Sequence, residues 1–128
     1  MSYYFSTTLV VDFDEAVRLV KESLRQEGFG VLTEIDVQAT MKAKLGVDFR
    51  KYRILGACNP KLAHEALQLE DKIGVMLPCN VIVQDQGGGR VQVAAIDPVA
   101  SMLAVENPRL KEAAAVVRAK LKAVIDSL

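Results

Sequence analysis

The sequence predicts a single α+β domain in which an antiparallel or mixed β-sheet carries its helices on one face. Three observations predict this class. β-branched and aromatic segments alternate with amphipathic segments in the order β-α-β-(α)-β-α-β-β-α. A glycine-rich turn joins the last two strands directly, which makes that pair antiparallel. The length of 128 residues suits one domain with a buried core.

The first strand and helix are predicted from residue type and spacing. Residues 3–11 are β-branched and aromatic, which favours a strand. Asp12 and Glu15 have the spacing of a capping box, and Gly28 is a typical C-terminal stop, so a helix is expected between them. The apolar residues of this helix recur at helical spacing and predict its buried stripe: Phe13, Ala16, Val17, Val20 and Leu24.

The next two strands flank a short helical segment. Apolar and polar residues alternate over about 31–37, which predicts a strand with one buried and one wetter face. Residues 40–46 are expected to form one or two helical turns closed by Gly46. A third strand is predicted over 51–58.

Asn59-Pro60 predicts the start of a helix, because asparagine caps helices and proline suits their first turn. This helix is expected to run through Gln68, with Leu62, Ala63, Ala66 and Leu67 on its inner side. A fourth strand is predicted over about 73–84, with a bulge, break or edge at Pro78. Residues 85–90 form the hairpin turn before a fifth strand over 91–96.

Two further cap-and-proline pairs follow the fifth strand. Asp97-Pro98 predicts a single helical turn, and Asn107-Pro108 predicts the start of the last helix. The apolar seam of that helix has spacings of four and three residues, and we expect it to lie on the sheet rather than in a coiled coil. Its members are Leu110, Ala114, Val117, Leu121, Val124 and Leu128.

The last two strands carry apolar residues on both faces. Helices on one face would cover only half of them, and large exposed apolar patches usually mark a contact with a partner. We therefore expect a homodimer that covers the second face. The residues concerned are Val81, Val83, Val93 and Ala95 on one set of positions and Ile82, Ala94 and Ile96 on the other.

Composition excludes some classes of function. Sixteen basic and sixteen acidic residues cancel, so no basic surplus favours nucleic acid as a partner. No stretch approaches the roughly 20 apolar residues of a membrane span, and the N-terminus does not resemble a signal peptide. A cytoplasmic location is expected, where two cysteines are more often reduced thiols than a disulfide.

Two Cys-Asn steps and one histidine are the candidate reactive residues. Cys58 directly precedes the Asn59 cap, near the positive end of a helix dipole, which favours a thiolate. Cys79 follows Pro78 and is not in a CxxC motif with Cys58. With His64, the two cysteines would make a soft-metal set for copper or zinc. Small buried hydrophobes remain the alternative for both cysteines, and an exposed helical residue for His64.

Other polar residues have two interpretations each. Asp97 is interpreted as a helix cap or as a polar group that lines a site at the end of a strand. Asn80 is interpreted as a turn residue or as a hydrogen-bonding group in a site. The glycines at 87–89 do not match a phosphate-binding loop, and the sequence contains neither GxSxG nor HExxH.

Three segments taken in order resemble a known family. ACNPKLAHEAL, then IGVMLPCNVIV, then AIDPVASML resemble the family called domain of unknown function 302, and most of all its thermophile representatives. The resemblance covers nearly the whole chain. It implies a TATA-binding-protein-like fold and a small homodimer, but no DNA binding, because fold does not carry function. It also implies a candidate ligand or metal site at Cys58, Asn59, Pro60, His64, Pro78, Cys79, Asn80, Asp97 and Pro98.

Three functions remain open from the sequence. The first is a non-enzymatic homodimeric module that binds or senses a small molecule. The second is a protein that handles thiols or a soft metal through Cys58, Cys79 and His64. The third is a thiol-dependent enzyme with Cys58 as nucleophile and His64 as base. The sequence contains no catalytic motif that makes the third the preferred one.

Overall fold

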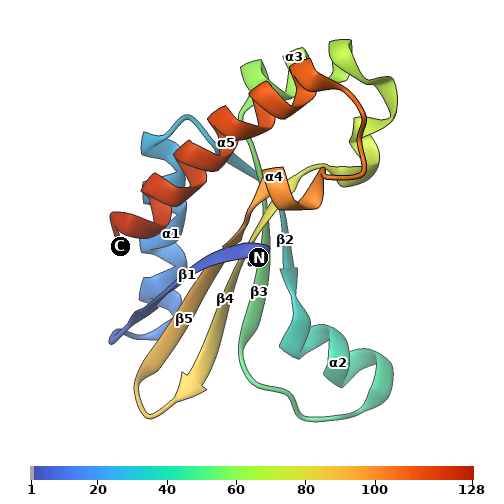
Figure 1. The fold of residues 1–128 in the computed structure, drawn as a ribbon. Coiled ribbons are helices and arrows are strands. Elements are labelled where there is room, and N and C mark those ends of the chain that lie inside the picture. Colours follow the sequence, from blue (N-terminus) through green and yellow to red (C-terminus); the bar gives the residue numbers. More distant parts are fainter. Residues whose placement is uncertain (1) are drawn as a thin grey trace.

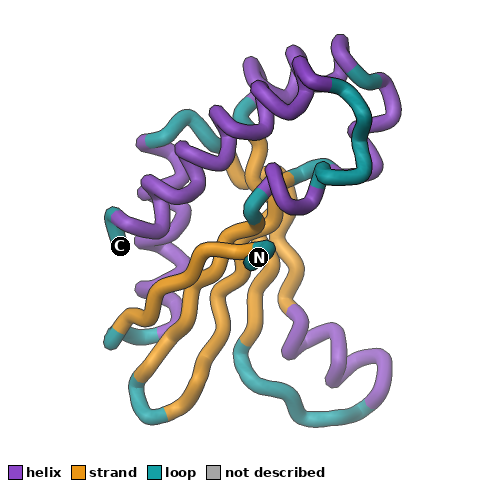
Figure 2. The backbone as a smooth tube through the Cα atoms, viewed as in Figure 1, coloured by secondary structure: helices purple, strands orange, loops and turns teal. Residues whose placement is uncertain are grey.

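Five strands and their helices form the structure, a computed structural model that describes residues 2–128 (Figures 1 and 2). The elements follow in the predicted order. The single turn predicted at Asp97-Pro98 is present, and one short helix before the fourth strand is additional. They are β1 Tyr4–Leu9, α1 Phe13–Gln26, β2 Gly30–Asp36, α2 Val37–Leu45, β3 Tyr52–Cys58, α3 Pro60–Leu69, the 3-10 helix η1 Asp71–Met76, β4 Cys79–Gly87, β5 Arg90–Ile96, α4 Pro98–Ser101 and α5 Pro108–Asp126.

The strands form one sheet in the order β1-β5-β4-β3-β2, and all neighbours are antiparallel. The predicted α+β class is confirmed, in its fully antiparallel form. The β4–β5 hairpin turns at Gly87, Gly88 and Gly89, which all have positive φ. Glycine adopts that conformation without strain, so the predicted turn over 85–90 is confirmed as well.

Helices α1 and α5 cover one face of the sheet (Figure 1). All five residues of the predicted α1 stripe are buried. They share one core with side chains from the central strands and from the C-terminal half of α5, including Leu55, Val81, Val93, Leu121 and Val124. Burial of a large aliphatic side chain contributes roughly 1.5–3 kcal/mol, so this core determines where both helices lie on the sheet.

The N-terminal half of α5 extends beyond the sheet and packs against α3, η1 and α4. A second cluster of buried side chains forms there, made of Ala66, Ile73, Met102, Leu110 and Ala114. The seam of the last helix therefore lies on the sheet only in its C-terminal half, as at Leu121 and Val124. The space where the two clusters approach each other contains the candidate site.

The start of α1 differs from the prediction. Asp12 is the N-cap residue, but its side chain makes no capping hydrogen bond. The Glu15 carboxylate accepts hydrogen bonds from the Arg18 guanidinium one turn further on. The predicted capping box is therefore wrong, because Glu15 pairs within the helix instead of with the cap.

The segment around β2 and α2 also differs. Most of β2 is exposed, and a bulge interrupts its pairing with β3 between Val31 and Thr33. The predicted alternation of a buried and a wet face is wrong, because β2 is an edge strand that α1 and α5 leave largely uncovered. Asp36 caps α2 by accepting a hydrogen bond from the backbone N–H of Ala39, at 3.0 Å. The helix therefore starts before residue 40, and it ends at Gly46 as predicted.

The strand predicted over about 73–84 is wrong in its first part. Residues 71–76 form η1, and β4 starts only at Cys79. The break expected at Pro78 is present and marks the start of the strand. Ile73 is buried in the second cluster, so the apolar residues before Pro78 serve helix packing and not sheet pairing.

The second face of the sheet has no helix over its central strands. A hollow of about 400 Å³ lies on this face, lined by uncharged side chains that include Tyr4, Tyr52, Ile82, Ala94 and Ile96. Helix α2 contains no buried residue and stands apart from the other helices in Figure 1. Within residues 2–128, no helix has the length and apolar character needed to cross a membrane.

Candidate functional site

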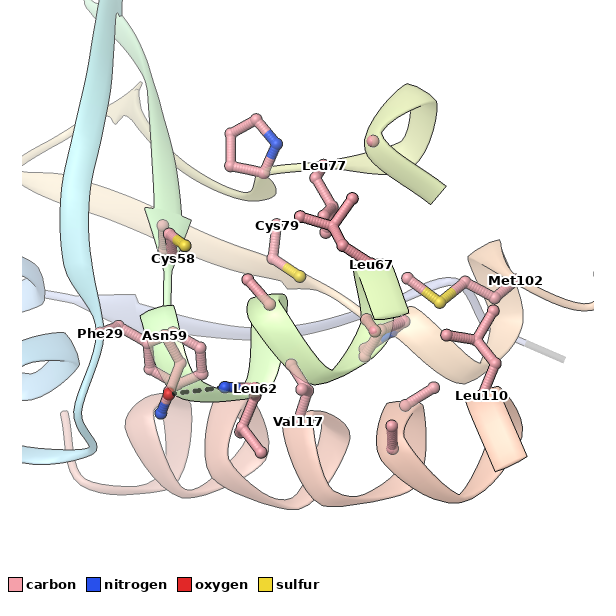
Figure 3. A pocket seen from close by; sticks show the side chains of 18 of the residues that line it. Phe29, Cys58, Asn59, Leu62, Leu67, Leu77, Cys79, Met102, Leu110 and Val117 are labelled. Carbon is pink, nitrogen blue, oxygen red and sulfur yellow. Dashed lines mark hydrogen bonds between the residues drawn. The ribbon is translucent and has the colours of Figure 1, made fainter. Parts of the chain in front are cut away.

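A cavity of about 340 Å³ lies where the ends of β3 and β4 meet α3 and α5 (Figure 3). We call it the α3–α5 pocket. Its walls come from both buried clusters, and none of the described residues that line it is charged. They are Phe29, Leu32, Ala57, Cys58, Asn59, Leu62, Ala63, Ala66, Leu67, Gly74, Leu77, Pro78, Cys79, Pro98, Met102, Leu110, Ala113, Ala114 and Val117.

Both cysteines line this pocket, and both are free thiols. Cys58 is the last residue of β3 and is half-buried, whereas Cys79 is the first residue of β4 and is only 8% exposed. Burial, and to a smaller extent the nearby charge of a Cys58 thiolate, together raise the pKa of the Cys79 thiol from 9.0 to about 11. Cys79 is therefore a neutral thiol near pH 7.

Asn59 and Pro60 hold the helix that forms one wall. The Asn59 side-chain oxygen accepts a hydrogen bond from the Leu62 backbone N–H at 3.3 Å, drawn as a dashed line in Figure 3. Pro60 occupies the first turn, as predicted. Asn59 lines the pocket and Pro60 does not. The predicted inner side of this helix is confirmed, because Leu62, Ala63, Ala66 and Leu67 all face the pocket.

His64 lies outside the pocket. It is exposed on α3 and is absent from the pocket walls. Among residues 2–128, no three His, Cys, Asp or Glu side chains lie together in a way that could hold a metal ion. The structure therefore brings Cys58 and Cys79 to one place but does not assemble them with His64 into the predicted metal set.

Pro78 and Asn80 lie on either side of Cys79 and face different surroundings. Pro78 lines the α3–α5 pocket. Asn80 is exposed and lines the hollow on the opposite face of the sheet, because successive strand residues point to opposite faces. Asn80 therefore belongs to the open sheet face and not to the pocket.

Asp97 acts as a helix cap. It is 5% exposed, and its carboxylate accepts hydrogen bonds from the backbone N–H groups of Val99 and Ala100. The same carboxylate pairs with the Arg118 guanidinium at 3.1 Å, which joins the start of α4 to the middle of α5. Pro98 is buried and lines the pocket. Asp97 therefore positions the pocket wall from behind without facing the cavity.

The pocket wall from α5 was not predicted. Leu110, Ala113, Ala114 and Val117 line the cavity, although most of them belong to the seam expected on the sheet. The sequence did contain a signal for this wall. The apolar seam of the last helix is longer than a strand of seven residues, so its first turns must pack against something other than the sheet. No pattern in the sequence indicated that Leu77 and Met102 would line the pocket, because their positions depend on how η1 and α4 pack.

Comparison with known proteins identifies the family. The model of the family described as domain of unknown function DUF302 matches residues 5–128. A crystal structure of an uncharacterised conserved DUF302 protein from Bacillus stearothermophilus is similar, with 31% identity, 98% of each chain covered and a TM-score of 0.90. A search of curated proteins found no match. The chain belongs to the family called domain of unknown function DUF302.

Proposed function

We propose that this protein binds a small, uncharged and largely apolar molecule in the α3–α5 pocket. The observation that carries the proposal is the composition of the pocket walls. A cavity of about 340 Å³ falls in the size range of small-molecule sites, and apolar walls with few polar groups are typical of them. A charged ligand would lose its hydration there without gaining an ion pair, which is costly.

The sulfur atoms and one amide supply the polar character of the pocket. Asn59 already uses its side-chain oxygen in the helix cap. Cys79 is a neutral thiol near pH 7, and both sulfurs are soft and polarisable. These groups favour ligands that bind by shape and dispersion, with at most a weak hydrogen bond.

Filling the pocket is expected to weaken binding. Replacing Ala113 with phenylalanine places a ring in the cavity, whereas the same change at the exposed Ala115 on α5 leaves the cavity open. We expect a neutral fluorescent probe, N-phenyl-1-naphthylamine, to bind the wild type and A115F equally. A113F should bind at least about tenfold more weakly, which corresponds to about 1.4 kcal/mol. Fluorescence titration measures this.

Two results would contradict the proposal. One is a wild-type protein that does not bind the probe, and the other is an A113F variant that binds it as tightly as A115F does. Circular dichroism spectra of both variants establish that they are folded. Both substitutions add the same ring to the same helix. A difference in probe affinity between the two variants is therefore due to the filling of the cavity.

We also propose that a second copy of the chain covers the open face of the sheet. The hollow on that face is lined by tyrosine, glutamine, asparagine, alanine and isoleucine side chains and by no charged residue. An uncharged surface fits an uncharged partner, and a twofold dimer pairs a surface with itself. Burial of the two faces against each other would remove Ile82, Ala94 and Ile96 from water.

A charge in the middle of this face should separate the dimer. We expect the wild type to sediment as a dimer at micromolar concentration and Ile82→Lys to sediment as a monomer, because the lysine would be buried without a partner. Val10→Lys is the control, since Val10 is 79% exposed in the turn after β1. Analytical ultracentrifugation that finds only monomeric wild type would exclude this dimer.

A further inference from the structure

Helix α2 buries none of its nine residues against the rest of the described chain. Leu45 at its end and Val47 just after it are 69% and 44% exposed. An isolated helix shorter than about 12–15 residues is marginally stable in water, and most helices in proteins are stabilised by packing. Contact with a second molecule would therefore supply the packing that α2 does not obtain within its own chain.

Helix α2 stands at the rim of the open sheet face. Ile35 of β2 pairs with Ile54 of β3, which pairs with Ile82 of β4. Paired residues of neighbouring strands point to the same face, and Ile82 lines the hollow on the open face. Ile35 therefore belongs to that face, and Ala39 and Ala43 of α2 line one groove with it. A molecule that covers the open face up to the β2 edge would also contact α2.

The 3-10 helix η1 lies at the other end of the strands from α2. The loop after α2 leads into the start of β3, whereas η1 precedes Cys79 of β4, which pairs with Ala57 near the end of β3. Figure 1 shows α2 below the strands and η1, the yellow-green segment before β4, above them. The Pro78 ring between η1 and β4 lies against Gly56, which pairs with Asn80 of the open face. Helices α2 and η1 therefore border the open face at opposite ends.

The size of a stable interface favours a wider contact than the hollow alone. The hollow is lined by nine residues, whereas a stable interface involves about 20–30 residues on each side. A twofold axis that crosses the strands between two sheets packed face to face brings each end of one sheet over the opposite end of the other. Such an axis places α2 of one copy against η1 of its partner, and the same contact forms twice.

Residues 37–51, which we call the basic arm, combine positive charge with exposed apolar side chains. They contain four basic residues and one acidic residue, Asp48, whose carboxylate pairs with Lys42 at 3.2 Å. Lys44 and Lys51 are exposed, and neither has an ion-pair partner among the described residues. The arm therefore fits an acidic surface that also contains apolar side chains.

Residues 70–76 and 104–106, which we call the acidic end, provide such a surface. Both segments line a hollow of about 410 Å³, and Val75 in its wall is 88% exposed. The two segments contain three acidic residues and one basic residue, Lys72, which pairs with Asp71 at 3.3 Å. A negative surplus therefore remains beside exposed apolar surface.

We propose that the basic arm of each copy packs against the acidic end of a second copy, in a twofold dimer that contains this contact twice. The inference rests on the proposed dimer, because the contact flanks the open sheet face that the dimer covers. Lysine side chains of the arm pair with carboxylates of the acidic end, and the exposed apolar side chains of both segments pack together. The charges also determine how the two sheets are turned relative to each other, since two arms in contact would repel.

Charge reversal on each side tests the contact. One variant carries Lys44→Glu and Lys51→Glu, and the other carries Asp71→Lys and Glu106→Lys, all at exposed positions. Each variant alone should dimerise at least about tenfold more weakly than the wild type, because both of its contacts join like charges. An equal mixture of the two variants should form a heterodimer about as tightly as the wild type, since one contact is native and the other has both charges exchanged. Sedimentation velocity over a dilution series measures the dissociation constants.

A third variant, with Lys61→Glu and Lys120→Glu, is the control for net charge. These two lysines lie on α3 and α5, outside the basic arm and the acidic end, so this variant should dimerise like the wild type. Reversed variants that dimerise as tightly as the control would overturn the inference. So would a mixture that dimerises no more tightly than the two variants do alone, because the weakening would then have a cause other than the paired charges.

The Ile82→Lys variant separates this inference from the proposed dimer. Normal dimers of the reversed variants together with monomeric Ile82→Lys would remove the arm contact and leave the covered sheet face. Recovery in the mixture together with dimeric Ile82→Lys would remove the covered face and leave the arm contact. A monomeric wild type would remove both.

Discussion

Replacing Gly56 with alanine is expected to lower the free energy of unfolding by about 3 kcal/mol, the upper part of the usual range for overpacking. Gly56 is buried in β3, where it pairs with Asn80 of β4 and lies beside Thr33 of β2. A Cβ atom at this position would overlap the Thr33 hydroxyl and lie 2.7 Å from Cγ of Pro78. The proline ring cannot rotate away, so the backbone must shift.

A matched glycine on the neighbouring strand provides the control. Gly30 of β2 is exposed, and a Cβ atom there would meet nothing within 4 Å. Gly30→Ala is therefore expected to be neutral or to stabilise the protein by up to about 1 kcal/mol, because alanine loses less entropy on folding. Urea unfolding of the two variants and the wild type measures the difference. Equal stability of both variants would contradict the close approach at Gly56.

A double variant separates the two neighbours of Gly56. Thr33→Ala removes the hydroxyl that the new methyl group would meet, but it leaves the Pro78 ring in place. We expect Gly56→Ala with Thr33→Ala to recover part of the lost stability and not all of it, as for residues in direct contact. Because Pro78 lines the α3–α5 pocket next to Cys79, the single variant should also bind the neutral probe more weakly.

Local signals in the sequence predicted the parts of the fold that depend on local backbone chemistry. Asn59, Asp97 and Asn107 each precede proline, and each accepts a backbone hydrogen bond from the first turn of its helix. Gly46 and the three hairpin glycines have positive φ, as their positions indicated. A cap residue or a turn glycine acts on the few backbone groups next to it along the chain. Its type and position in a single sequence are therefore sufficient to predict it.

Features that depend on distant partners were not predictable in the same way. The segment before Pro78 has the apolar content of a strand. It forms η1 instead, where Ile73 packs in the second buried cluster. The alternation of buried and exposed residues predicted for β2 is wrong. β2 is an edge strand that α1 and α5 leave largely uncovered, so few of its side chains are buried on either face. The TATA-binding-protein-like label for the fold stays a prediction.

The candidate site was predictable in its residues but not in its geometry. The family signature includes Cys58, Asn59, Pro78, Cys79 and Pro98, which all line one pocket. Asn80 belongs to the opposite face of the sheet, because alternate strand residues point in opposite directions. Which signature residues converge is determined by strand register and helix packing, and no spacing along the chain encodes those.

The buried Cys79 thiol should make the protein less stable at alkaline pH. Its pKa is about 11 in the folded protein against 9.0 for the unperturbed thiol. A group whose pKa is raised by folding contributes its full stability below the unfolded value and loses it as the pH rises toward the folded value. The loss therefore starts near pH 9.0 and continues to about pH 11, at about 1.4 kcal/mol for each pH unit.

The variant Cys79→Ala isolates this contribution. Lysine and tyrosine residues titrate in the same range in both proteins, so only the difference between the two unfolding curves belongs to Cys79. We expect the variant to be less stable than the wild type at pH 8, because it leaves a small cavity beside Ala57 and Val81. The wild type should then lose up to about 3 kcal/mol of that advantage by pH 11. A difference between the two proteins that stays constant from pH 8 to pH 11 would mean that Cys79 ionises in the folded protein as easily as in the unfolded chain.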